Sequence, residues 1–355
     1  MTIKSSGQLT FTEIHDEFAS LGSNFGQKPY TLSEYRTLPA GIGLPQSGEI
    51  KFSDFYGKSN IIFVEASEWI AISDTQIASQ YNIKECNLWT ALQAMGYTDP
   101  TRLYDITIPA NYWLWSDDVA VGGLTIPSDM TGNIWLRNNG NIIGKGGNGG
   151  TSPTGSGQNG GPALVIENTQ TPIQIINGAG AYIAAGGGGG EANYGAGGGG
   201  AGGGNGGNGG NTQRNGRGGV GGAILSAGTN GGGGSQASGG RGGGSGGGGG
   251  GADTDGSICK DNGSGGGGGG GRILPGVGGI AVASQDGNGG KGGSANSNGS
   301  LGSNANGGDG GGGWGADGAS RSTSGSGGSG GRAIAKEATS TNVITINSGN
   351  IWGKA

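Results

Sequence analysis

Histidine and cysteine are almost absent from this sequence. Its 355 residues contain one histidine, His15, and two cysteines, Cys86 and Cys259. Because His15 lies near the N-terminus, no serine–histidine or cysteine–histidine pair is expected in the C-terminal half, which excludes the usual nucleophilic hydrolases there. The two cysteines lie in different predicted regions, so we expect both to be free thiols.

Apolar and charged residues are also scarce. Only 31% of the residues are hydrophobic and 12% are charged, and the net charge is −5. Basic and acidic side chains balance between Gly144 and Gly331, so a basic face that binds nucleic acid is not expected. No apolar run is long enough to cross a bilayer, and the N-terminal MTIKSSGQL lacks a signal-peptide core. We therefore predict no membrane insertion, and a chain made and assembled in a cytoplasm.

Glycine is abundant, with 95 residues that lie mostly between Gly144 and Gly331. A large conventional core cannot form from this region, so we expect such a core in about the first 140 residues. The pattern G-x-G-G-x-G-G recurs as GKGGNGG, GNGGNGG, GRGGVGG, GNGGKGG and GSGGSGG. Its two variable positions are three residues apart, which is the repeat of the polyproline-II conformation.

Such tracts form no hydrogen bonds within themselves, so their backbone groups need neighbours. Bare glycine edges allow close approach, and we predict a bundle of packed polyglycine-II helices. Tracts with side chains on one edge are expected in outer layers, and the featureless tracts 186–190, 246–251 and 265–271 in an inner layer. A flexible Gly/Ser linker is the alternative, but the recurring tract length and the apolar segments between tracts favour order. Collagen is excluded, because proline is scarce and glycine does not occupy every third position.

A short internal echo marks the N-terminal 58 residues. SGQLTFTEI returns as SGEIKFSDF, with YTLSEY between them. This pattern predicts short helices with Thr12, Ser33 and Ser53 as N-caps. A unit this small buries little by itself, so residues 1–58 are predicted to be a docking module. Its exposed aromatic residues are expected to be Phe11, Tyr30, Tyr35, Phe52, Phe55 and Tyr56.

Residues 59–143 indicate a compact α+β platform. IIFVEA predicts a strand, Ile83–Met95 predicts a helix that ends at Gly96, and ITIPANYWLW and GLTIPSD predict further strands. NIWLRNNGNIIG returns as TPIQIINGAGAYIAAG and as NVITINSGNIWG. Each copy is an alternating apolar strand that meets a turn signal, which predicts three β-hairpins. Two would lead into glycine tracts, and the third would close the chain.

The order of these motifs resembles that of receptor-recognising tail proteins of tailed bacteriophages. The resemblance rests on LQAMGY, ITIP…GLTIP, LRNNGNIIGKGGNGG and GGPALVIEN…IINGAGAYIAAGGGGG, and it covers roughly Ile83 to Ala355. The Gly-rich half is similar to the tip adhesin of T-even-type long tail fibres. That resemblance implies a polyglycine-II sandwich with variable loops at its exposed end. The first 58 residues look like a short module found at the ends of various phage virion proteins, which implies attachment to the particle.

Loops on a rigid scaffold are where recognition concentrates, and few exposed aromatic and arginine side chains dominate binding energy. Trp314 and Arg321 are therefore predicted as anchors at the free end of the bundle. The full set of predicted receptor-binding residues is Trp314, Arg321, Tyr194, Arg214, Arg241, Asp255 and Lys260. The apolar connections AILSAG and RILPGVGGIAVAS are expected to face the platform, where they can be buried.

Asp253, Asp255 and Asp261 form the one cluster that suggests chemistry, because paired acids hydrolyse glycans. Loop carboxylates in a Gly-rich segment are usually only solvated, and the cluster lacks the spacing of a calcium loop. We predict no enzyme, no cofactor and no metal.

The predicted fold class is mainly β and irregular. It comprises the docking module (1–58), the α+β platform (59–143) and a polyglycine-II sandwich (144–355) with distal loops and a closing hairpin. The predicted function is a phage tail adhesin of the virion that binds a bacterial outer-surface protein or glycan and attaches to a tail or fibre protein. A purely structural tail-tip or baseplate protein is the alternative. An ice-binding polyglycine protein is a third, but it would need flat repeated faces, unlike the irregular segments ICKDN and NTQRNGR.

Overall fold

The computed structural model describes most of the chain. The described residues are 3, 6–18, 32, 35, 44, 47–56, 61–64, 66–77, 79–151, 155–167, 172–192, 196–208, 217–232, 247–250, 267–280, 289–302, 308–321, 326–336 and 343–354. The helices are α1 (Phe11–Phe18), the 3₁₀ helix η5 (Phe52–Phe55), α2 (Ala66–Ile72) and α3 (Leu88–Ala94). The strands are β1 (Ile61–Val64), β2 (Thr75–Ile77), β3 (Gln80–Lys84), β4 (Cys86–Asn87), β5 (Leu103–Ile108), β6 (Tyr112–Trp115), β7 (Leu124–Ile126), β8 (Ile134–Asn138), β9 (Asn141–Ile143), β10 (Leu164–Ile166), β11 (Ile173–Asn177), β12 (Tyr182–Ala184), β13 (Ile334–Lys336), β14 (Val343–Asn347) and β15 (Asn350–Trp352).

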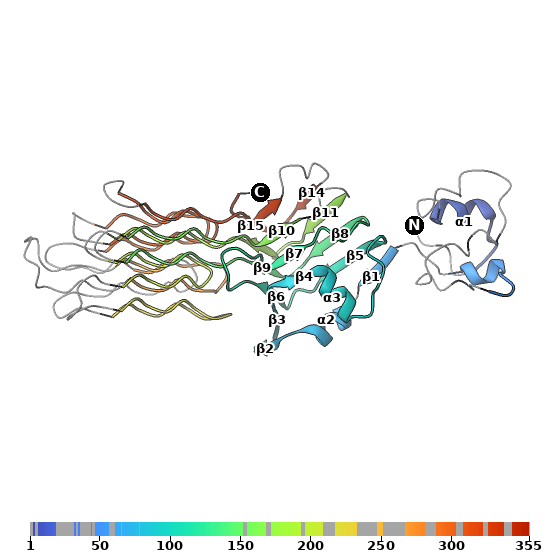
Figure 1. The fold of residues 1–355 in the computed structure, drawn as a ribbon, viewed down its shortest axis with the longest axis horizontal. Helices are drawn as coiled ribbons and strands as arrows, with labels where there is room; N and C mark the ends of the chain where they lie inside the picture. The colour runs from blue at the N-terminus through green and yellow to red at the C-terminus, as the bar shows by residue number, and fades with distance from the viewer. Residues whose placement is uncertain are drawn as a thin grey trace, which may run out of the picture.

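The strands form three sheets that the chain visits in a fixed rotation. The sheets are ordered β1-β5-β8-β11-β14, β15-β12-β9-β6-β3-β2 and β13-β10-β7-β4. From β5 the chain passes to β6 and then β7, one strand in each sheet, and β8 returns to pair with β5 in parallel. Each circuit therefore adds one strand to each sheet, and the result is a three-sided parallel β-helix (Figure 1). We call it the platform.

Alternation of apolar and polar residues along each strand fits this arrangement, because every second side chain points into the β-helix. Ile134 of β8 aligns with Ile173 of β11, and Leu136 aligns with Ile175. All four side chains are buried in one core cluster that draws on all three sheets. A conventional core therefore exists, but strands from beyond residue 143 complete it.

Asparagines stack at one corner of the β-helix. Asn138 Nδ2 donates to Asn177 Oδ1 at 2.8 Å, and Asn177 Nδ2 donates to Asn347 Oδ1 at 2.9 Å. The same two amides also donate to the carbonyl oxygens of Tyr182 and Asn350, where the next strands begin. This ladder satisfies buried polar groups at the bend between two sheets.

The three predicted β-hairpins are wrong. β8 and β9 lie in different sheets, and so do β11 and β12, and β14 and β15. The repeated motif is real, but each copy is one corner of a β-helix circuit, and each strand pairs in parallel with its counterpart in the next copy. The turn signals bend the chain from one sheet to the next.

The predicted helix over Ile83–Met95 is shorter than expected. Its first residues belong to β3 and β4, and only Leu88–Ala94 is helical. Asn87 Oδ1 accepts a hydrogen bond from Thr90 N at 3.0 Å, so Asn87 is the N-cap. The helix ends before Gly96, as predicted, and Gly96 has a φ of +97°. The strand predicted from IIFVEA is confirmed as β1.

The glycine tracts, here called the bundle, run side by side away from the platform (Figure 1). The tract 186–191 shows the pattern of its hydrogen bonds. The amides of Gly186 and Gly189 donate to the tract 157–161. Those of Gly187 and Gly190 donate to the tract 196–201, and those of Gly188 and Glu191 donate to the tract 316–319. Residues three apart therefore bond to the same neighbour. This is the period expected from the sequence pattern. The amides bond the tract to three neighbours, and its carbonyl oxygens accept from the tracts 146–150, 308–313 and 326–331.

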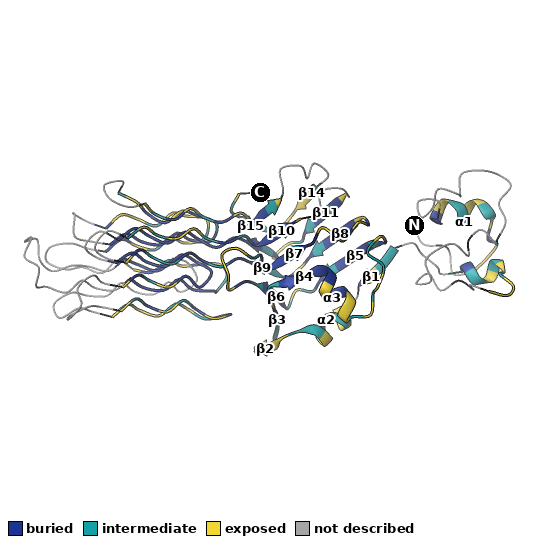
Figure 2. Cartoon of the chain, in the orientation of Figure 1, coloured by how far each residue is buried: buried dark blue, intermediate teal, exposed yellow. Residues whose placement is uncertain are grey.

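Close approach requires glycine at these positions. A Cβ atom on Gly188 would lie 1.8 Å from Gly328 O, and one on Gly189 would lie 1.9 Å from Asn148 O. Figure 2 shows buried residues along the length of the bundle. At its outer edges, side chains take the place of a neighbouring tract: Asn205 Oδ1 accepts from Gly221 N, and Asn159 Oδ1 from Ser329 N.

The N-terminal module has a small core of its own. Phe18, Tyr35 and Phe55 are fully buried and contact one another edge-on or tilted. The expectation that Tyr35 and Phe55 are exposed is therefore wrong. Phe11, Phe52 and Tyr56 are half-buried, and Tyr30 lies outside the described residues.

The predicted N-caps of this module are displaced. Thr10, not Thr12, precedes α1, since Thr10 Oγ1 accepts from Glu13 N and Glu13 Oε2 accepts from Thr10 N at 2.7 Å. Lys51 occupies the corresponding position before η5, where Asp54 Oδ2 accepts from Lys51 N. Ser53 therefore lies inside η5, and Ser33 lies outside the described residues. The sequence echo reflects an acid three residues after each cap.

Candidate functional site

The bundle is inserted twice at the same corner of the platform. The first tract follows β9 and returns to β10, and the remaining tracts lie between β12 and β13. Gly144 N donates to Ala184 O, and Ala185 N donates to Trp352 O, so both outgoing tracts continue the stacking of the strands. One end of the bundle is therefore held by the platform, and the other is free (Figure 1).

Five turns of the described residues lie at the platform end: 201–203, 223–226, 272–276, 294–297 and 314–315. Ile224 is buried in a cluster with Trp113 and Ile143 of the platform, and Leu225 and Leu274 pack against that cluster. The prediction that AILSAG and the start of RILPGVGGIAVAS face the platform is thus confirmed. Val277 and Ile280, later in that segment, are exposed.

Trp314 lies at the platform end, which contradicts its prediction as an exposed anchor at the free end. Its side chain is fully buried in the cluster that contains Trp113, Ile143 and Ile224. Gly315 N donates to Ala185 O, which fixes this turn against the end of β12. The ring packs because it is the largest apolar group in the turn.

A second set of contacts, the anchor cluster, joins the bundle to the platform through Arg272. The guanidinium is nearly buried; Nε donates to Gly202 O, and Nη2 donates to Ser116 O and to Asp117 Oδ1 at 2.6 Å. It also lies over the Trp115 ring, 4.7 Å from the centroid. Lys145 Nζ donates to the same Asp117 oxygen at 2.6 Å.

Charges in the anchor cluster support one another. Burial raises the pKa of Asp117, but hydrogen bonds from Lys145 and Arg272 outweigh it and lower that pKa below its ordinary value of 3.8. Burial lowers the pKa of Lys145, and its bond to Asp117 opposes that shift. The cluster is therefore expected to be ionised at neutral pH, with two cations around one carboxylate.

Several described tracts end at the free end of the bundle. They are the tracts on either side of segments 193–195, 209–216, 303–307 and 322–325. Of the predicted receptor-binding residues, Tyr194, Arg214, Arg241, Asp255 and Lys260 lie outside the described residues. Arg321 is described at the end of its tract, with a side chain that is 16% exposed and paired with Asp309 (Nε–Oδ1, 3.5 Å). The structure thus separates Trp314 from Arg321, since they lie at opposite ends of one tract.

Sequence reasoning missed two residues at this end, Glu191 and Asp309. Both are fully buried, and each adjoins a glycine run. Burial raises the pKa of Asp309, while the Gly302 amide and Arg321 lower it. A lone acid within a glycine tract is the signal that could have identified them, because an inner tract position has no access to water.

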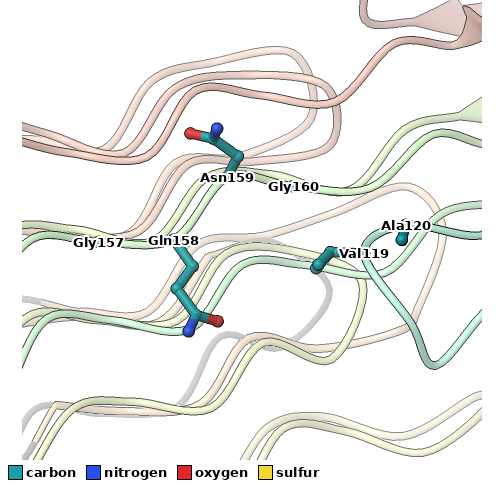
Figure 3. Close-up of a pocket in the computed structure, with 6 residues that line it drawn as sticks. All are labelled: Val119, Ala120, Gly157, Gln158, Asn159 and Gly160. Atoms are coloured by element: carbon teal, nitrogen blue, oxygen red, sulfur yellow. The ribbon is translucent and has the colours of Figure 1, made fainter.

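A shallow groove of about 510 Å³ runs along the side of the bundle near the platform. It is lined by Val119, Ala120 and residues 157–160, and Figure 3 shows the Gln158 and Asn159 side chains pointing away from each other. No charged side chain lines it. We assign it no ligand.

Little else in the described part of the chain suggests chemistry. No group of three or more His, Cys, Asp or Glu side chains comes together there as a metal site. Cys86 is a free thiol, and burial raises its pKa to about 12, so it is not reactive. Cys259, Asp253 and Asp261 lie outside the described residues. None of the described helices is both long and apolar enough to span a membrane.

Comparison with known proteins gives one family. Residues 73–246 match the family described as phage tail fibre adhesin Gp38. No curated protein matches the chain significantly. Among solved structures, the chain is similar to the gp37–gp38 adhesin tip complex of the bacteriophage S16 long tail fibre, with 17% identity, a TM-score of 0.45 and 99% of each chain covered. The resemblance to phage tail adhesins found in the sequence is confirmed, because residues 73–246 are similar to the tail fibre adhesin family.

Proposed function

Starting from a tail fibre adhesin, we propose that this chain binds a bacterial surface receptor through the segments at the free end of the bundle. The observation that carries this proposal is the polarity of the bundle. The turns at the platform end are tied down by buried contacts of Trp314, Ile224 and Arg272. The opposite end is the part of the bundle that is left to meet another surface.

We further propose that the tracts are polyglycine-II helices. Two observations support this: the hydrogen bonds repeat every three residues, and an added Cβ would lie less than 2 Å from a neighbouring backbone at positions such as Gly188 and Gly189, as expected for an extended threefold backbone with bare glycine edges. Such a scaffold is preorganised, so its loops lose little entropy as a group on binding.

The proposed contact residues are Tyr194, Arg214, Arg241, Asp255 and Lys260, each of which belongs to a segment between tract ends. Trp314 is no longer among them, because it is buried at the platform. The partner on the bacterium is a surface protein or glycan. The N-terminal module is proposed to attach the chain to a fibre protein of the virion.

The test is competition for adsorption. Purified chain is expected to block adsorption of the phage to its host, and a variant with Arg214, Arg241 and Lys260 all changed to serine is expected to block at least about tenfold less well. Val277→Ser and Ile280→Ser, exposed on the side of the bundle, serve as the control. Loss of blocking in the control alone, or equal blocking by all variants, would place recognition elsewhere.

A further inference from the structure

Three tracts end together in a charged cluster that the receptor-binding model does not use. The tract 186–192 ends near Glu191, the tract 308–313 begins near Asp309, and the tract 316–321 ends at Arg321. Asp309 N donates to Glu191 O, and Glu191 N donates to Ala319 O, so the three tracts are also joined by their backbones at this level. We call Glu191, Asp309 and Arg321 the loop-root cluster.

Each carboxylate of this cluster binds the root of a different segment. Glu191 Oε2 accepts from Ser320 Oγ at 3.0 Å and from Arg321 N at 2.8 Å, immediately before segment 322–325. Asp309 Oδ1 accepts from Gly302 N at 2.8 Å, so it links the two sides of segment 303–307. Arg321 Nε lies 3.5 Å from the same Asp309 oxygen.

Charge at this place is costly, and simple capping does not require it. Both carboxylates are fully buried, and burial of a charge is unfavourable unless it is paired and hydrogen-bonded. At other positions in the bundle a neutral side chain is enough to accept an outward amide, as Asn208 does for Gly218 N and Ser300 for Lys291 N, and the acid Asp317 that accepts from Gly330 N is exposed. Here Glu191 accepts from the backbone amide of Arg321 and Asp309 pairs with its side chain, so acids from two different tracts hold the end of a third.

We propose that Glu191, Asp309 and Arg321 are positioning residues, which fix the roots of segments 193–195, 303–307 and 322–325 relative to one another and thereby set the arrangement of the receptor-binding segments. The proposal rests on the proposed receptor-binding function. It also gives Arg321 a different role from the one predicted, because its side chain acts within the bundle and not on the receptor.

The test uses the full chain with Asp309→Ala and Arg321→Met. Asp317→Ala is the matched control, because Asp317 is also an acid whose Oδ1 accepts a backbone amide, that of Gly330, but it is exposed and outside the cluster. Amide exchange at Gly302 is expected to accelerate at least about tenfold in Asp309→Ala, while Gly188 and Gly199 in the tract interiors keep their rates. Blocking of adsorption is expected to fall by about tenfold in both cluster variants and to stay within about twofold in the control.

The outcomes separate this proposal from the receptor-binding proposal. If Asp309→Ala leaves Gly302 exchange unchanged, or if both cluster variants block adsorption as well as the parent chain does, the positioning role is overturned. If the parent chain itself fails to block adsorption, receptor binding by this chain is overturned, while the exchange rates still report whether the cluster holds the loop roots. Accelerated exchange at Gly188 as well would show that the whole bundle is loosened, and that result also overturns a local role.

Discussion

Single glycines in the inner tracts are expected to tolerate no side chain. In Gly188→Ala the new Cβ would lie 1.8 Å from Gly328 O, and the hydrogen-bonded tracts on all sides prevent the tract from moving aside. We expect the free energy of unfolding to fall by about 1–3 kcal/mol or more. Lys291→Ala, at an exposed position of an outer tract, is the control and should change it little. The measurement is the midpoint of thermal unfolding of both variants, and equal midpoints for Gly188→Ala and Lys291→Ala would contradict the layered packing.

Arg272 is expected to be the single most important charged residue for the junction of bundle and platform. Arg272→Met keeps much of the volume but leaves the carbonyl oxygens of Gly202 and Ser116 without this donor. The expected loss is about 1–3 kcal/mol of stability. Denaturant unfolding measures it, and Arg217→Met, in a tract away from the platform, provides the comparison. If both variants lost the same free energy of unfolding, the effect would come from removing any positive charge and not from the contacts of Arg272.

The anchor cluster should make stability depend on acid. The pKa of Asp117 is lower in the folded chain than its ordinary 3.8, so its contribution is complete above pH 3.8 and is lost as the pH falls through the folded value. Asp309 acts in the opposite direction, because burial raises its pKa. We therefore compare Asp117→Asn with the parent chain between about pH 5 and pH 2. The variant should lose less stability over this range, and parallel curves would refute the assignment.

At the scale of elements, the asparagine ladder is expected to hold one corner of the β-helix. Asn177 is buried and bonds to both neighbours in the ladder, whereas Asn347 is exposed at its end. Asn177→Ala should cost about 1–3 kcal/mol, because it removes the acceptor of the buried Asn138 amide and one of the two donors to the side-chain oxygen of Asn347. Asn347→Ala should cost less. The ratio of the two losses in denaturant unfolding is the measurement, and a larger loss at Asn347 would exclude this role.

The repeats were predictable from sequence, but their pairing was not. The spacing of side chains in G-x-G-G-x-G-G indicates a threefold tract, and the same period appears in the hydrogen bonds of residues 186–191. The motif that contains Asn138 and its two copies was also recognisable. An alternating strand followed by a turn signal, however, looks the same in a hairpin and at a β-helix corner. Only the partner strand distinguishes them, and that partner lies in the next copy, as Ile173 does for Ile134.

Of the predicted contacts at the two ends of the bundle, those of Ile224 with the platform are confirmed, and the exposure of Trp314 at the free end is wrong. Apolar content correctly placed Ile224 at the platform, but Trp314 was treated as a binding residue because aromatic residues are rare in the glycine region. The same apolar argument, applied to Trp314, would have placed it at the platform. Glu191 and Asp309 could each have been noticed as a lone acid in a glycine tract, but their proximity could not, because nothing local in the sequence shows that two acids over 100 residues apart lie at one level of the bundle.

At the scale of the whole molecule, the N-terminal module is expected to be separable. Its core shares no residue with the core of the platform. A chain that starts near residue 60 should therefore fold and still block adsorption, but it should not be incorporated into virions. Incorporation is measured by complementing a phage that lacks the gene with the shortened one. If the shortened chain is incorporated normally, the attachment site lies in the platform and not in the N-terminal module.

The hydrogen bonds of the bundle run sideways between tracts that lie along its long axis. When an anchored particle is pulled by flow, tension on the free end is carried along this axis into the platform. The hydrogen bonds between tracts are then loaded in shear, so many of them must break at the same time. In a β-hairpin pulled apart from its open end, by contrast, they break one after another. A scaffold with few side chains in its interior would in this way resist mechanical load along its axis through the number of its backbone hydrogen bonds.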